Sequence, residues 1–141
     1  MVITIEQKNI ETITAFIEAF WNQSDMESTE RFLSTDYQEH SYQSKEGLKQ
    51  FAGKILEAFP DKQYTVEEIV AQGEKVIVRM VVKGTHKGVF FGTSPTGNSI
   101  DVTLYRQYRV VDGKIAEHRG WIDMMTMWRQ IQGKTFPNAV T

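Results

Sequence analysis

The sequence contains no cysteine among its 141 residues. This excludes disulfide bonds, thiolate nucleophiles and metal sites built from thiolates, and it is compatible with a reducing compartment. The amino-terminal segment MVITIEQKNI also lacks the basic stretch and apolar core of a secretory signal peptide. We therefore expect a cytoplasmic protein.

Long hydrophobic runs and a strong excess of one charge are missing as well. No apolar run approaches the roughly 20 residues that a membrane-spanning helix needs, and the formal net charge is only −2 with both signs mixed along the chain. These features argue against a membrane or nucleic-acid partner. The three histidines are scattered and lack a carboxylate cluster, so we expect no metal site. With 40% hydrophobic and 24% charged residues, the composition is that of one globular domain over residues 1–141.

The first 60 residues show helical spacing of apolar side chains. Residues 10–21 have this spacing, and Thr4 and Gln7 form a possible capping box in front of it. A further helix is predicted from Ser44 until Pro60 ends it. The segment DYQEHSY before Ser44 is expected to be extended.

From residue 63 onward the apolar side chains alternate, as they do in strands. The alternation predicts strands over residues 63–72, 75–86, 100–111 and 114–122, with Gly73-Glu74 and Asp112-Gly113 as hairpin turns. A last helix is predicted over residues 124–132. The order of elements indicates an α+β domain whose helices pack on one face of an antiparallel sheet.

The register of the last hairpin decides which side chains face the interior. If Asp112-Gly113 is a two-residue turn, the inward face carries the even positions from 102 to 110. Trp121 and Asp123 then point inward, and His118 points away. A single bulge would invert this assignment. In the first hairpin Glu68 faces Arg79, and we favour an ion pair over a substrate-binding role for Arg79.

Asp123 allows two interpretations. It stands between Trp121, Ile122 and several methionines, and a carboxylate taken out of water in such surroundings needs a partner or a raised pKa. It also stands directly before the helical segment MMTMWRQI, where an aspartate is a good N-cap. From the residues alone, both a buried acid and a structural cap remain open. His86, which ends the apolar row of its strand, is likewise either a cavity residue or a core histidine.

Four segments together resemble a known family. GTHKGVFFGTSPTGNSI, FPD at 59–61, EHS at 39–41 and YRVVDGKIAEHRGWID are similar to the SnoaL-like polyketide cyclases, also called ester cyclases, of the nuclear transport factor two-like superfamily. The resemblance covers nearly the whole chain. It implies a cone, in which a strongly curved antiparallel sheet wraps around helices and encloses a deep apolar pocket. It also implies a homodimer.

The resemblance further implies a reaction, an intramolecular aldol ring closure. In these cyclases an aspartate at the end of the last strand acts as general acid/base, and the matching position here is Asp123. The family pattern often has a tryptophan four residues earlier, where this chain has Arg119. A base over the acidic carbon and a donor for the enolate oxygen suffice for such chemistry without a cofactor.

These considerations predict the following site. Asp123 and His40 are the expected catalytic residues, and a small hydrophobic ligand is expected to contact His86, Trp121, Leu104, Met80, Phe59, Phe51 and Tyr37. Three functions compete: a cofactor-independent enzyme, a non-catalytic binder of small apolar molecules, and a dimerisation scaffold. The polar content of the pocket distinguishes an enzyme from a binder.

Overall fold

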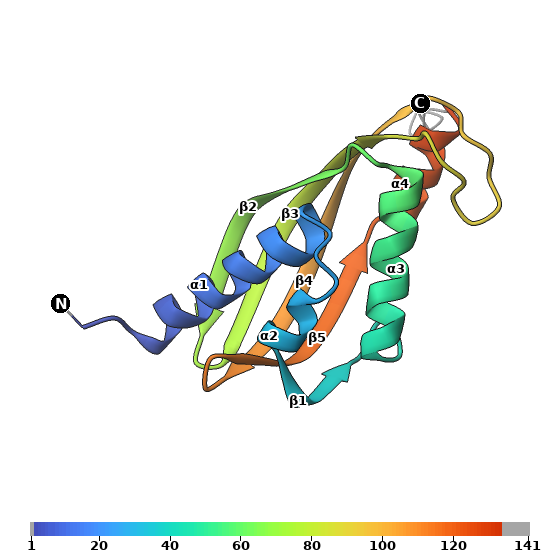
Figure 1. Cartoon of the computed structure of the whole chain (residues 1–141). Coiled ribbons are helices and arrows are strands. Elements are labelled where there is room, and N and C mark those ends of the chain that lie inside the picture. Colours follow the sequence, from blue (N-terminus) through green and yellow to red (C-terminus); the bar gives the residue numbers. More distant parts are fainter. Residues whose placement is uncertain (1, 134–141) are drawn as a thin grey trace.

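The computed structural model describes residues 2–133, in which a five-stranded sheet carries helices on one face (Figure 1). The strands lie in the order β1-β5-β4-β3-β2. The elements along the chain are α1 (Ile5–Phe16), the π-helix η1 (Ile17–Asn22), α2 (Ser28–Phe32), β1 (Leu33–Glu39), α3 (Lys45–Ala58), β2 (Gln63–Gln72), β3 (Lys75–Thr85), β4 (Ser99–Val111), β5 (Lys114–Ile122) and α4 (Met124–Ile131). The α+β class is confirmed.

The helices begin where their capping residues stand. The Thr4 hydroxyl accepts from the Gln7 amide at 3.1 Å, and the Gln7 side chain accepts from the Thr4 amide at 2.9 Å, so the predicted capping box is formed. Ser44 caps α3 by accepting from the Gly47 amide at 3.0 Å. Since proline restricts the residue before it, α3 ends at Ala58, shortly before Pro60.

The two hairpins are also confirmed, with strand ends shifted by one residue at most. The Asp112-Gly113 turn has positive φ at both residues, 48° and 76°, as the tight turn that matches strand twist requires. The sheet curves around the helices (Figure 1), and it stays open because β1 and β2 are edge strands.

A bulge in β2 shifts the register within the first hairpin. Glu68 pairs with Arg79 as predicted, but the register shifts between Glu68 and Val66. Glu67 and Glu68 consequently both lie on the outer face, where their carboxylates approach the Arg79 guanidinium at 3.4 and 3.7 Å. The ion-pair interpretation of Arg79 is confirmed.

A bulge in β5 overturns the predicted register of the second hairpin. Val111 pairs with Lys114 and Val110 with Ile115, but beyond this point Arg109 pairs with Glu117. Ile115 and Ala116 are both buried. Between the two pairs β5 therefore contains one residue more than β4. Every later β5 residue therefore points to the opposite face from the one predicted.

The sequence did not predict β1 as a sheet strand pairing parallel to β5. This pairing sets Glu39 beside His118. The core lies between the sheet and the helices, and its largest side chains include Trp21, Phe16 and Phe20 from the first helical segment and Tyr108 from β4. Within residues 2–133, no helix is long and apolar enough to cross a membrane.

Candidate active site

A buried carboxylate and a buried imidazole meet where β1 pairs with β5. The Glu39 side chain is fully inaccessible and that of His118 is 1% exposed. Nδ1 of His118 lies 2.9 Å from both carboxylate oxygens of Glu39. Tyr37 donates its hydroxyl to the same carboxylate at 2.6 Å, and the Ser41 amide donates at 3.0 Å. Glu39 is thus held by several donors in the interior.

Arg106 extends this contact from β4. Its Nη1 lies 3.1 Å from Nε2 of His118 and 3.4 Å from the Tyr42 hydroxyl. Its guanidinium carbon stands 3.9 Å from the centre of the Trp21 ring, a cation–π arrangement. We call Glu39, His118 and Arg106 the buried relay.

The partners of the relay fix its protonation. Arg106 can only donate, so Nε2 of His118 accepts and Nδ1 carries the proton that binds Glu39. Burial lowers the pKa of His118 to about 4, with Glu39 opposing and Arg106 reinforcing the shift. Burial would raise the pKa of Glu39, but the hydrogen bonds from His118 and Tyr37 outweigh it and hold that pKa below its ordinary range. At neutral pH the relay therefore holds a cation, a neutral imidazole and a carboxylate.

A surface hollow of about 340 Å³ adjoins the relay at the start of α3. Tyr42, Phe51 and Phe91 are among its lining residues. Tyr42 and Phe51 stack with ring centres 4.5 Å apart, and the Tyr42 ring lies 6.0 Å from that of His118. Tyr42 therefore lines the hollow and contacts the relay.

Asp123 does not lie in the interior, which corrects the expectation of a buried acid. It is exposed, and its carboxylate accepts from the amide of Thr126 at 3.1 Å and from the hydroxyl at 2.7 Å, as the N-cap of α4. These hydrogen bonds lower its pKa, whereas burial was expected to raise it. The cause is the β5 bulge, which turns the end of this strand outward.

His40 and Trp121 are likewise misplaced by the prediction. Nε2 of His40 lies 2.8 Å from the carboxylate of Glu117, an exposed contact outside the relay. Trp121 is 56% exposed and lines a different surface hollow, together with Tyr105 and Asp123. Neither side chain reaches the interior.

The other predicted ligand residues are mostly interior. Leu104, Met80 and Phe59 are fully buried core residues. Phe51 lines the hollow, and Tyr37 contacts Glu39.

His86 is a buried histidine at the end of β3. It is fully buried, with Nδ1 3.0 Å from the Thr96 hydroxyl and its ring packed on Phe59. It lies eight positions beyond Val78, the β3 partner of Arg106, or roughly 26 Å along the strand. It is therefore not part of the relay. Whether any of these residues binds a ligand stays a prediction.

The relay was not predicted, because the expected register places His118 on the outer face. One signal was available: Ile115 and Ala116 are consecutive apolar residues in an otherwise alternating strand, as at a bulge. Arg106, on the facing strand, is buried in the relay, whereas Glu117 binds Arg109 and His40 on the outer side.

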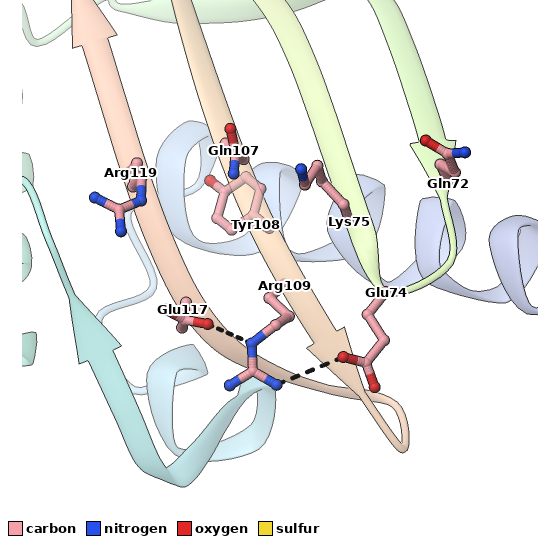
Figure 2. A pocket seen from close by; sticks show the side chains of 8 residues that line it. All are labelled: Gln72, Glu74, Lys75, Gln107, Tyr108, Arg109, Glu117 and Arg119. Atoms are coloured by element: carbon pink, nitrogen blue, oxygen red, sulfur yellow. Dashed lines mark hydrogen bonds and ion pairs between the residues drawn. The ribbon is translucent and has the colours of Figure 1, made fainter.

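A second hollow, of about 400 Å³, lies on the opposite face of the sheet. Figure 2 shows its charged side chains in front of the strands and the helices behind them. Arg109 bridges Glu117 and Glu74 there. The carboxylates of Glu74 and Glu117 are therefore already bound to a cation in this hollow. Within the described residues, no three histidine or acidic side chains gather as a metal site would need.

Comparison with known proteins identifies the family of the chain. The sequence model of the SnoaL-like polyketide cyclase family matches residues 11–131. The chain is 27% identical over 137 residues to the aklanonic acid methyl ester cyclase DnrD of Streptomyces peucetius, covering 91% of this chain and 92% of that protein.

Two solved structures show the same fold. AclR of Streptomyces galilaeus, a proposed hydroxylase, has a TM-score of 0.85 and 29% identity, covering 96% of this chain and 88% of its own. IdmH of Streptomyces antibioticus, a proposed polyketide cyclase, has a TM-score of 0.79 and 31% identity. The match covers 88% of this chain and 98% of IdmH. The chain therefore belongs to the SnoaL-like polyketide cyclase family.

Proposed function

We propose that the protein is a cofactor-independent cyclase-type enzyme that acts on an apolar, carbonyl-bearing compound by acid/base proton transfer. The observation that carries the proposal is the buried relay. A carboxylate orients an imidazole, and an arginine lies next to the reactive nitrogen, an arrangement suited to a positioned base and an oxyanion donor.

The steps follow from the atoms of the relay. Nε2 of His118 removes a proton from the carbon beside a carbonyl. Nη1 of Arg106 keeps its proton and redirects its hydrogen bond from Nε2 to the enolate oxygen. Glu39 stabilises the imidazolium that forms. The enolate carbon then attacks a second carbonyl of the same molecule and closes the ring. The imidazolium returns its proton to the new alkoxide, which leaves His118 neutral again.

The lowered pKa of His118 suits this role in one respect. With a pKa of about 4, the imidazole is unprotonated at neutral pH and can accept a proton. The same shift makes it a weak base, so the mechanism requires a carbon acid that is already activated, such as one between two carbonyl groups.

The test is an assay with the methyl esters of aklanonic and nogalonic acid, the compounds for which curated relatives are named. We expect ring closure by the wild-type protein and a loss of at least about 100-fold in kcat in His118→Gln. Asp123→Asn is the matched control, because it alters an exposed carboxylate outside the relay. Activity that survives His118→Gln but disappears in Asp123→Asn would contradict the proposal.

A non-catalytic binder of small apolar molecules is the second candidate. It is favoured by the contact between Arg106 and Nε2 of His118, which occupies the lone pair that a base needs. Binding of either ester without any turnover, unaffected by His118→Gln, would support the binder.

A further inference from the structure

Several buried polar atoms around Arg106 lack a hydrogen-bond partner within residues 2–133. They are Nε and Nη2 of Arg106, Nε1 of Trp21 and the hydroxyl of Tyr108. The three side chains are at most 2% exposed. Burial raises the pKa of the Tyr108 hydroxyl, and the Trp21 indole lies close enough to oppose part of that rise, yet neither atom reaches hydrogen-bonding geometry. The unpartnered atoms thus gather in one place.

Donors outnumber acceptors among these atoms. The guanidinium and indole nitrogens can only donate, whereas the Tyr108 hydroxyl can donate one proton and also accept. One acceptor beside Arg106, Nε2 of His118, is already used by Nη1 of Arg106. Burying such donors unpaired is costly, above all for a charged group. The missing component is therefore an acceptor, and beside a guanidinium an anionic oxygen fits best.

Tyr42 provides the connection to the surface. Its hydroxyl contacts Nη1 of Arg106 at 3.4 Å, a long contact that an anionic oxygen could replace. On its other side Tyr42 lines the surface hollow with Phe51 and Phe91, and Phe91 is 53% exposed. An aromatic body would pack on these rings.

We propose that Arg106, Trp21 and Tyr108 form a subsite for a carboxylate or enolate oxygen of an aromatic ligand, which enters at the Tyr42 hollow. This inference rests on the proposed function in placing the ligand at the same site, and it adds the substrate class. The ligand carries an ionised oxygen next to an aromatic system. Binding itself needs no turnover, so it is measurable separately from catalysis.

The test compares 1-naphthoate with 1-naphthamide, which has the same shape but no charge, by isothermal titration calorimetry. We expect the wild-type protein to bind the carboxylate at least 10-fold more tightly. Arg106→Gln should abolish this preference. Tyr108→Phe, which removes only one oxygen and keeps the ring, should weaken carboxylate binding several-fold and leave amide binding unchanged.

Arg119→Gln is the control for charge alone, because Arg119 lines the hollow on the opposite face; it should bind both probes as the wild type does. Equal affinity for both probes, or a preference that survives Tyr108→Phe and Arg106→Gln, would overturn the subsite and leave buried water as the partner of these donors. A preference for the carboxylate without ring closure of any ester would preserve the subsite and reject the cyclase. Ring closure of an ester without a preference for the carboxylate would preserve the cyclase and reject the subsite.

Discussion

At the scale of single residues, Asp123 was open to two interpretations, a buried acid or a helix cap, and the structure has it as the cap. Its carboxylate satisfies the Thr126 amide and hydroxyl at the start of α4, and aspartate and asparagine cap helices about equally well. We predict that Asp123→Asn leaves the free energy of unfolding within a few tenths of a kcal/mol of wild type, whereas Asp123→Ala lowers it by about 1 kcal/mol. Urea unfolding at pH 7 measures both. Equal losses in the two variants would speak against the cap.

His118 gives the pH dependence of stability at the same scale. Its pKa falls from 6.5 to about 4 on folding, so between these values the unfolded chain binds the extra proton. Stability is therefore fully present above pH 6.5 and declines as the pH falls toward 4, by about 3 kcal/mol at most. Unfolding free energies measured from pH 7 to 4 should show this decline, and His118→Gln should remove it. An imidazole that titrates near 6.5 by NMR would refute the prediction.

At the scale of the strand, Gly120 allows the relay to form. A Cβ at this position would stand 2.6 Å from Nη1 of Arg106 and 3.2 Å from the His118 ring. We predict that Gly120→Ala lowers the free energy of unfolding by about 1–3 kcal/mol through overpacking, and that it also separates Arg106 from His118, which reduces cyclase activity.

The matched control for Gly120 is Gly53 in α3, where an added Cβ meets nothing within 4 Å. Gly53→Ala should stabilise the protein by up to about 1 kcal/mol because alanine is the better helix former. Thermal unfolding of both variants tests the pair. A Gly120→Ala protein as stable and active as wild type would show that the relay tolerates a side chain there.

At the scale of the whole molecule, the outer face of the sheet exposes more apolar surface than solvent contact requires. Val70, Tyr105 and Trp121 are 57%, 44% and 56% exposed, and Tyr105 pairs with Trp121 across β4 and β5. We propose that two copies associate through this face, burying about 800 Å² on each. Sedimentation at tens of micromolar should give a dimer, and Trp121→Glu a monomer. A monomeric wild-type protein would exclude this arrangement.

The sequence by itself determined the long helices, the strands β2 to β5 and their order. Local signals sufficed for this: the Thr4 and Ser44 caps, Pro60, the Asp112-Gly113 turn and the change from helical to alternating spacing each act within a few residues. The family resemblance supplied the curved sheet. Interior positions such as Leu104 and Met80 followed directly from the alternation.

Only the tertiary structure decided which side chains meet in the candidate site. One extra residue in β5 reverses the faces of everything after Ala116, so it buries His118 and exposes Trp121 and Asp123. The carboxylate partner of His118 comes from β1, 79 positions away in the chain, through a parallel pairing that no local pattern specifies. Alternation sets the spacing of side chains along a strand, but bulges and long-range pairing set the face on which they meet.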